Sequence, residues 1–413
     1  MNSIFQYQYF LLPILRLELL SRVFLIASFF SLPISTAATN LFMGLTLITW
    51  TLAGGYKTRL SQLQGNWFAY SVVILFSVIC IGGLYSTGSQ KEVFFQVHKY
   101  AKILFILPAI TLLQEKKWQQ RALIAFSSAM FLTLALSLIT VIWPLSFIPS
   151  TANGPTDNHF IFKDHIAQNL MMSFFAFFLA VNTLFTTNAK TRVILFSLAA
   201  LAVIDILFFV AGRTGFLSLA FNALVFLFFL PSKKQKIGGL FLLVILTALT
   251  FQFSENFRSR TELAITEFNS QDKKELTSVG QRVEFFKKSV QLIKEKPVLG
   301  FGTGSYAREF CRIADSAEWC EAGRFHPHNQ FLAFLVQLGV VGLVVYMIFI
   351  GAAIKSATDQ PHIIKICALG LVATLIADSI THAPLFLVTE AQFFILLFAV
   401  LLTKNRKNTI ETK

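Results

Sequence analysis

The chain has 413 residues, of which 55% are hydrophobic and only 14% are charged, and its mean hydropathy is +0.65. Soluble globular domains carry about 25% charged residues, so this composition excludes an ordinary soluble enzyme or binding module. The formal net charge of +14 suggests an anionic partner at first sight, but the distribution of the charges, described below, indicates a different cause.

Apolar runs of about 20 residues recur along the chain, and each is long enough to cross a hydrocarbon core of about 30 Å. Because lipid offers no hydrogen bonds to the backbone, such runs are predicted to be helices. The sequence therefore predicts an all-α polytopic membrane protein with about twelve transmembrane helices and no cleaved signal peptide. In chain order the helices are expected at 23–38, 40–56, 67–84, 96–113, 122–143, 165–187, 193–210, 214–230, 237–254, 329–350, 365–380 and 386–403.

The basic residues lie on one side of this predicted topology. With the N-terminus in the cytoplasm, the inner segments contain 18 lysines and arginines and four acidic residues, which accounts for the whole net charge. An excess of Lys and Arg in cytoplasmic loops is the usual topology signal of membrane proteins, so we expect no nucleic-acid partner. A single crossing over 23–56 would reverse the pattern, so a turn is expected near Pro33. The inner segments are 1–22, 57–66, 114–121, 188–192, 231–236, 351–365 and 404–413.

One long polar segment, residues 255–328, interrupts the apolar pattern on the outer side. It separates the first nine helices, 1–254, from the last three helices and a short cytoplasmic tail, 329–413. The segment contains Cys311 and Cys320, and in an oxidising compartment a disulfide between them is expected. The outer segment and the nearby helix ends are therefore the places where function is expected.

Arg213 forms the outer turn between two apolar helices, in the sequence Ala-Gly-Arg-Thr-Gly over 211–215. Ionisable residues at membrane depth are costly and are functional candidates by default. The flanking glycines permit the close approach of a ligand or of another backbone. A guanidinium fork at this point would suit a phosphate or pyrophosphate at the membrane surface. The alternative is that Arg213 reaches to lipid headgroups.

An amphipathic helix is predicted over 280–293 from apolar residues at helical spacing, namely Val283, Phe286, Val290 and Ile293. Arg282 stands in its first turn, where a cation opposes the helix dipole, so an anionic partner is expected nearby. A solvated arginine is the alternative. The glycine-rich run 300–304 lacks the GxGxxG spacing and is expected to be a turn, not a nucleotide loop.

The outer segment returns to the membrane at His326-Pro327-His328-Asn329. Pro327 disfavours helix at His326, so the next helix is expected to begin near His328. A histidine at a helix N-terminus has a lowered pKa, and a neutral imidazole is what a general base requires. The alternatives are a pair of interfacial histidines or, with further ligands, a zinc site.

The outer loops contain no DxD or ExD pair, and Asp157 and Asp164 are isolated. This pattern argues against a glycosyltransferase that anchors a divalent metal with paired carboxylates. We therefore expect no metal and no other cofactor.

At these residues the sequence resembles the O-antigen ligase family, which also includes O-antigen polymerases and protein O-oligosaccharyltransferases. Family ligases carry an H-[NSQ]-x9-G-x-x-[GTY] pattern after a large periplasmic loop, and His328, Asn329, Gly339 and Gly342 fill it. Upstream, Gly-Arg-Thr over 212–214 and Gln-Arg over 281–282 match the family's two essential arginines in order and setting.

The resemblance implies a metal-independent, inverting glycosyltransferase of the GT-C type in the bacterial inner membrane, with its active site facing the periplasm. The donor would be a glycan on undecaprenyl pyrophosphate, and the acceptor a sugar hydroxyl of lipid A–core, in lipopolysaccharide biosynthesis. Arg213 and Arg282 would bind the pyrophosphate and offset its developing charge. His328 would accept the proton of the acceptor hydroxyl, with Asn329 beside it in the substrate site.

Four further residues are candidates to support this site. Lys99 and Lys102, near the outer end of the fourth predicted helix, would supply cations for the substrate; the alternative is that both reach to the membrane surface. Asp378 and His382 lie four residues apart on one face of the eleventh helix. They are candidates to orient the site, with a purely structural hydrogen bond as the alternative.

Three other functions compete with ligation. A polymerase would join two lipid-linked glycans, but polymerases usually depart from the complete histidine–glycine pattern. Protein O-oligosaccharyltransferases share the pattern but usually carry a long C-terminal extension, and here ten residues follow Thr403. A transporter of lipid-linked sugars would show inverted repeats and broken helices near the membrane midplane, and we find no such repeat.

Overall fold

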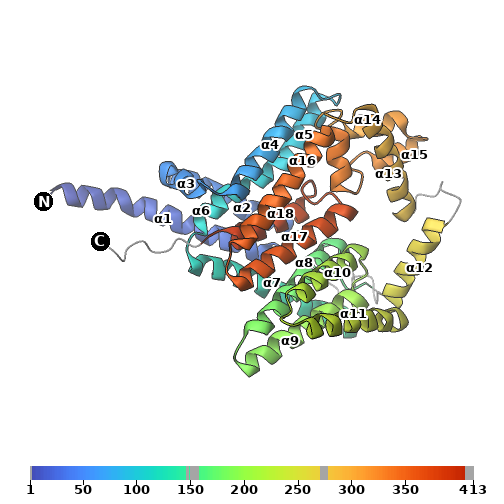
Figure 1. Ribbon diagram of the computed structural model, residues 1–413. Helices are drawn as coiled ribbons and strands as arrows, with labels where there is room; N and C mark the ends of the chain where they lie inside the picture. Colours follow the sequence, from blue (N-terminus) through green and yellow to red (C-terminus); the bar gives the residue numbers. More distant parts are fainter. Residues whose placement is uncertain (1, 146–147, 149–157, 270–277, 405–413) are drawn as a thin grey trace.

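A computed structural model describes residues 2–145, 148, 158–269 and 278–404 of the chain (Figure 1). Throughout these ranges the secondary structure consists of helices and turns without a β-strand, as expected for the all-α class. Asp157, residues 270–277 of the outer segment and the tail from 405 onwards lie outside the described ranges.

Each of the twelve predicted segments coincides with a helix, and the predicted turn near Pro33 is present between two of them. The corresponding helices are α1 (Asn2–Ser31), α2 (Thr36–Leu52), α4 (Trp67–Leu84), α5 (Gln90–Ala101) continued by α6 (Ile106–Leu112), α7 (Lys116–Ile142), α8 (His165–Phe185), α9 (Ala189–Ile204), α10 (Arg213–Phe228), α11 (Lys233–Phe253), α16 (Gln330–Thr358), α17 (His362–Thr381) and α18 (Val388–Leu402). The remaining helices are α3 (Tyr56–Leu63), α12 (Glu255–Asn269), α13 (Ser278–Glu295), α14 (Tyr306–Ile313) and α15 (Ala317–Gly323).

Eight of the described helical stretches are long and apolar enough to cross a membrane by length and composition. Four of the twelve predicted segments, those in α1, α2, α10 and α18, are not among these eight. Helices α10 and α18 are apolar but have only 16 and 15 residues, and α2 is followed by α3 after a bend of 117°. The chain is therefore a multi-pass membrane protein, and twelve crossings remain a prediction.

The core of the bundle is built around α18. Every residue of this helix from Glu390 to Leu402 is buried. Around it, the rings of Phe68 in α4, Phe349 in α16 and Phe398 in α18 meet, with centroid distances of 5.2 Å from Phe68 to Phe349 and 5.4 Å from Phe68 to Phe398. Because lipid is as apolar as these side chains, such helices are held together by close packing and polar contacts more than by the hydrophobic effect.

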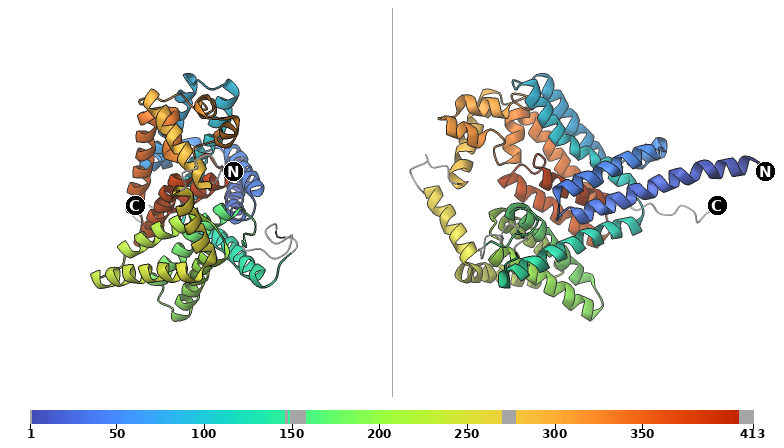
Figure 2. Two further views of the ribbon diagram at one scale, coloured as in Figure 1. Left: turned by 90° about the vertical axis from the view of Figure 1, so that its right-hand side faces the viewer. Right: turned by 180° about the vertical axis from the view of Figure 1, so that it is seen from behind.

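The two ends of the bundle carry different elements. Helices α1 and α3 extend from one end, whereas α13, α14 and α15 cover the opposite end (Figure 1). Figure 2 shows the same separation from behind, with α12 running from the end of α11 toward α13, at the end of the molecule that lies away from the N-terminus. The basic loop at α3 and the outer segment are thus at opposite ends, as the predicted topology requires.

The glycine-rich run 300–304 forms a tight turn between α13 and α14, as the sequence predicts. Gly300, Gly302 and Gly304 have φ values of 66°, 92° and 85°, which residues with a side chain rarely adopt. The turn lies on the outer end of α4, where the Thr303 N–H donates to the Gly82 carbonyl at 3.0 Å. The outer segment is thereby attached to the membrane helices.

Helix α16 is broken at Gly339, whose φ and ψ are 63° and −159°. Before the break, the carbonyls of Val336 and Gln337 accept hydrogen bonds from the N–H groups of Phe301 and Gly302, at 3.0 Å and 2.7 Å. The glycine turn therefore fills the break and supplies the donors that a continuous helix would have supplied. Gly339, the first glycine of the histidine–glycine pattern, thus permits the break in α16 that the glycine turn fills.

Candidate active site

The chain enters α16 through a strained turn that carries two histidines. His328 has a φ of 48°, in a left-handed region that costs a residue with a side chain about 1–3 kcal/mol. Its backbone N–H donates to Nδ1 of His326 at 3.1 Å, and the centroids of the two rings are 4.3 Å apart. His326 therefore holds the backbone of His328, a role that the sequence did not indicate.

Asn329 fixes the other side of this turn. Its Oδ1 accepts a hydrogen bond from the Leu332 N–H at 2.9 Å, as an N-cap residue does. Its Nδ2 donates to the Ile380 carbonyl in α17 at 3.0 Å. The amide that the sequence assigns to the substrate therefore also has a positioning role, because it sets His328 beside α17.

The imidazole of His328 lies among other rings. It stacks on Phe285 of α13 with 5.8 Å between centroids, and it lies 5.8 Å from the ring of His382. Burial, together with smaller effects of the nearby His382 and Arg282, lowers the pKa of His328 to about 4. His328 is thus neutral at pH 7 and able to accept a proton.

His382 directly follows α17 and links it to α10. Its Nδ1 lies 3.2 Å from Thr214 Oγ1 and 3.3 Å from Asp378 Oδ1, so the two residues predicted to share one helix face do approach each other. Burial lowers the pKa of His382 to about 4, and the charge of Arg282 adds to this effect. Asp378 is fully buried, and no described residue hydrogen-bonds to either of its carboxylate oxygens.

Arg213 is the first residue of α10 and is half-buried. The glycines that flank it permit close packing against another helix. A Cβ on Gly212 would lie 2.9 Å from Nδ2 of Asn169 in α8. A Cβ on Gly215 would lie 2.4 Å from the Cβ of the same asparagine. The start of α10, with Arg213 and the adjacent Thr214, is therefore seated directly on α8.

Arg282 lies near the start of α13 and is half-buried. Its positive charge contributes to the lowered pKa of both His328 and His382. Because such an effect requires proximity, this places the guanidinium group close to both rings. The structure thus brings Arg282 near His328 and His382, whereas Arg213 is connected to this group through its neighbour Thr214, which contacts His382.

The buried face of α13 differs from the predicted one. Phe285 and Leu292 are fully buried, whereas Phe286, expected on the inner face, is 56% exposed. Phe285 is on the inside because its ring packs between His328 and Phe310, at 5.8 Å and 5.4 Å. The amphipathic helix is confirmed, but the assignment of its inner face was wrong by one position.

The two predicted lysines have different positions. Lys99 of α5 lies with its Nζ 5.4 Å from the ring centroid of Phe386. Burial lowers the pKa of His326 to about 3, with smaller effects from His328, His382 and Lys99, so Lys99 is also near the histidines. Lys102 begins the 3₁₀ turn Lys102–Phe105 and is half-buried.

Residues 198–347 match the family model described as O-antigen ligase. Over these residues, about a third of the chain, the protein is similar to the O-antigen ligase family. No curated protein matches the chain. Arg213, Arg282, His328 and Asn329 lie within the matched region of the family, whereas Asp378 lies outside it.

The sequence missed one group of polar residues beside the family region. Glu390 in the first turn of α18 is 7% exposed and Lys163 is 8% exposed. Nζ of Lys163 donates to Thr36 Oγ1 at 2.5 Å, and Thr36 lies 3.0 Å from Thr389. Burial lowers the pKa of Lys163 to about 8, against the raising effects of Asp164 and Glu390. A single carboxylate inside an apolar run was the available signal for Glu390.

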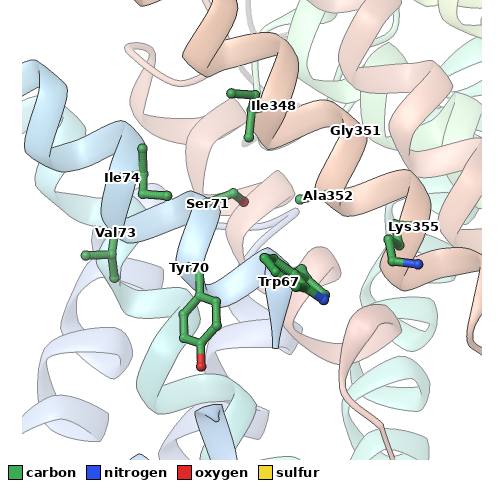
Figure 3. Close-up of a pocket in the computed structure, with 9 residues that line it drawn as sticks. All are labelled: Trp67, Tyr70, Ser71, Val73, Ile74, Ile348, Gly351, Ala352 and Lys355. Atoms are coloured by element: carbon green, nitrogen blue, oxygen red, sulfur yellow. The ribbon is translucent and has the colours of Figure 1, made fainter. Parts of the chain in front are cut away.

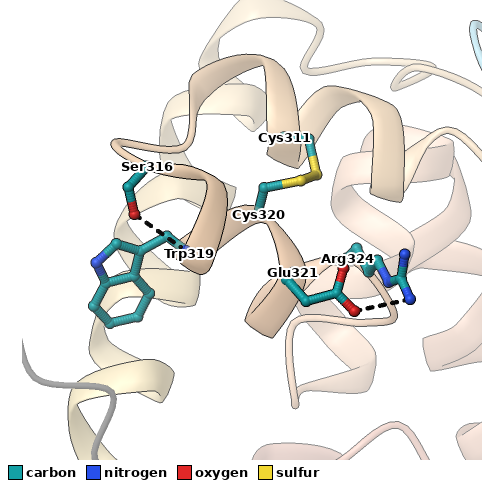
Figure 4. Close-up of a disulfide and its surroundings, with 6 residues drawn as sticks. All are labelled: Cys311, Ser316, Trp319, Cys320, Glu321 and Arg324. Atoms are coloured by element: carbon teal, nitrogen blue, oxygen red, sulfur yellow. Dashed lines mark hydrogen bonds and ion pairs between the residues drawn. A yellow bond between two sulfur atoms is a disulfide. The ribbon is translucent and has the colours of Figure 1, made fainter.

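Cys311 and Cys320 are joined by a disulfide in the structure, with 4.6 Å between their Cα atoms (Figure 4). The bond links α14 to α15, and Arg324 pairs with Glu321 just beyond it at 2.8 Å. Within the described part of the chain, no three His, Cys, Asp or Glu side chains converge as metal ligands would.

Proposed function

We propose that the protein is an O-antigen ligase that transfers a glycan from undecaprenyl pyrophosphate to a sugar hydroxyl of lipid A–core at the periplasmic face of the inner membrane. The observation that carries this proposal is the half-buried His328, whose imidazole stacks on Phe285 and lies near His382 and the positive charge of Arg282, in the region that matches the family. A base and a phosphate-binding group are the two functions that such a transfer needs.

The proposed reaction is a direct, inverting displacement. The acceptor hydroxyl attacks the anomeric carbon, the bond from that carbon to the pyrophosphate oxygen breaks, and the hydroxyl proton passes to His328. Nδ1 of His328 is buried, so Nε2 is the nitrogen that we assign as the base. Arg213 and Arg282 bind the pyrophosphate, whose negative charge increases as it leaves, so no divalent cation is required.

The remaining site residues support this reaction. Asp378 and Thr214 orient His382, which stands 5.8 Å from the His328 ring. Lys99 supplies a second positive charge near His326, and we place it with Lys102 toward the substrate's anionic groups. Asn329 contributes by holding the turn that carries the base.

The test is transfer by the purified protein in detergent with a lipid-linked donor and EDTA present. Separate reactions receive lipid A–core, a second lipid-linked glycan or a protein acceptor, which distinguishes ligase, polymerase and protein O-oligosaccharyltransferase. We expect product only in the reaction that receives lipid A–core as the acceptor. Movement of donor across vesicle membranes without any product would indicate a transporter, and a requirement for Mg²⁺ or Mn²⁺ would contradict the metal-independent reaction.

A panel of variants assigns the roles. His328→Ala should reduce the transfer rate by about 10²–10⁴-fold while the protein still binds donor. Arg213→Lys keeps the charge but loses the planar fork that matches two phosphate oxygens, so it should remain strongly impaired. Arg282→Ala should weaken donor binding as well as turnover. Normal transfer by His328→Ala would exclude His328 as the base.

His326 provides a second test of how the base is positioned. Because its Nδ1 accepts the His328 N–H, His326→Ala removes a support of the base and should lower the rate. His326→Asn keeps an acceptor at a similar position and should restore much of it. Equal loss in both variants would show that His326 has a role beyond this hydrogen bond.

A further inference from the structure

A groove of about 590 Å³ lies between α4 and α16, far along both helices from the histidines. Its walls are mostly apolar, and Trp67 and Tyr70 on its α4 side are 62% and 41% exposed. Figure 3 shows the side chains that line it, namely Trp67, Tyr70, Ser71, Val73, Ile74, Ile348, Gly351, Ala352 and Lys355.

The groove exists because small residues of α16 oppose bulkier ones of α4. A Cβ built on Gly351 would meet no atom within 4 Å. The same two helices pack tightly beside it, where Phe68 and Phe349 are 5.2 Å apart. The hollow is thus a local feature of a close-packed helix pair, and an apolar hollow of this kind in a membrane protein has the chemistry to hold an acyl chain.

The groove has a polar end. Lys355 lies at that end together with Trp67, which begins α4 (Figure 3). Aromatic and basic side chains together are typical of the level of lipid headgroups. Asp359, one turn after Lys355, forms its salt bridge with Lys404 at 3.0 Å and senses the charge of Lys355 only from a longer distance, so the ammonium group of Lys355 can still bind an external anion.

The depth of the groove also suits a lipid. From Trp67 to Ile74 the helix α4 rises about 10 Å, which is within the roughly 15 Å of one leaflet's hydrocarbon. The opposite end of α4 lies at Gly82, against the turn that carries Thr303. The groove is therefore at the end of the bundle away from the proposed active site, and its headgroup position is not that of the donor pyrophosphate.

We propose that this groove binds one anionic phospholipid, with the phosphate at Lys355 and an acyl chain along Ile74, Ile348 and Gly351. With the orientation proposed above, the lipid belongs to the cytoplasmic leaflet. Lipid binding itself depends neither on that orientation nor on the transfer reaction.

The test is native mass spectrometry of the full chain in detergent with added phosphatidylglycerol or phosphatidylcholine. We expect one phosphatidylglycerol to be retained at detergent levels that remove phosphatidylcholine. A lysine near a lipid phosphate contributes about 1 kcal/mol, so Lys355→Gln should weaken retention about fivefold. Gly351→Leu should fill the groove and abolish it.

Two matched variants serve as controls. Lys190→Gln removes an exposed lysine on the same predicted side, and Gly238→Leu enlarges a glycine of α11 that also has open space around it. Neither should change retention. Equal retention of the two lipids, or losses in the controls that match those in the groove variants, would overturn the proposal. Displacement by undecaprenyl phosphate in preference to phosphatidylglycerol would assign the groove to a polyprenyl chain and would also overturn it.

Discussion

His328 is held in a conformation that it would not adopt without its neighbours. The positive φ of 48° is maintained by the acceptor on His326 at 3.1 Å and by the cap that Asn329 provides. Strained residues of this kind persist where the surrounding structure over-determines them, and they gather at functional sites. The base of the proposed reaction is therefore pre-organised before substrate arrives.

The lowered pKa of His328 gives a pH prediction. An ordinary histidine loses its basic form as the pH falls through about 6.5, whereas His328 keeps it down to about 4. The fraction of neutral His328, and with it the transfer rate under saturating donor, should thus be nearly constant from pH 7.5 to pH 5.5. Initial rates across this range test the prediction, with His326→Asn as a comparison. A half-maximal rate near pH 6.5 would contradict it.

At the scale of single elements, the break in α16 shows why a glycine stands at position 339. With φ of 63° and ψ of −159°, the backbone there suits glycine alone, and a Cβ would lie 2.2 Å from the carbonyl oxygen of Val298. A residue with a side chain in such a backbone conformation costs about 1–3 kcal/mol of folding free energy. The start of α16, which carries His328, is positioned by this break.

Gly339→Ala should therefore lower the free energy of unfolding by about 1–3 kcal/mol from backbone strain, before any clash is added. The thermal midpoint of the purified protein should fall, and transfer should be reduced. Gly351→Ala lies in the same helix with open space around it, so it should leave the midpoint unchanged or raise it slightly. Circular dichroism or fluorescence melts in detergent measure the difference. Equal midpoints for the two variants would show that the break is not required.

The positions of the helices could be predicted from the sequence, but which face of a helix is buried was harder to predict. Apolar runs alone place all twelve segments, because membrane depth sets their length. The short helices α3, α14 and α15 carry no such run. The inner face of α13 was misassigned since helical spacing cannot distinguish Phe285 from Phe286 when both are apolar; contact with His328 decides between them.

At the scale of the whole molecule, the site is assembled from parts that are distant in sequence. The contact between Thr214 and His382 spans 168 residues, and that between Thr36 and Thr389 spans 353. Two arginines and a histidine in family order predict the centre of the proposed site, and Arg282 and His328 do lie near each other in the structure. The proximity of Glu390 to Lys163 depends on how the helices pack, which the periodicity of the sequence does not encode.

The charge asymmetry gives a prediction for the molecule as a whole. The basic inner segments and the outer segment lie at opposite ends of the bundle, so Lys234 and Lys294, both exposed, should be on opposite sides of the membrane. In intact cells a thiol reagent that cannot cross the inner membrane should label Lys294→Cys but not Lys234→Cys. Labelling of both only after the membrane is opened, or the reverse order, would contradict the orientation.

The position of α18 in the chain has a consequence for biosynthesis. This helix is buried along its length from Glu390 onward, yet it is the last one described, so ribosomes deliver the centre of the bundle after its walls. Until α18 is made, the surfaces of α6, α16 and α17 that pack on it have no such partner, and Asp378 and Lys163 lack Glu390 as a neighbour. Glu390 thus reaches Asp378 and Lys163 only after the helices that precede α18 in the chain have been made.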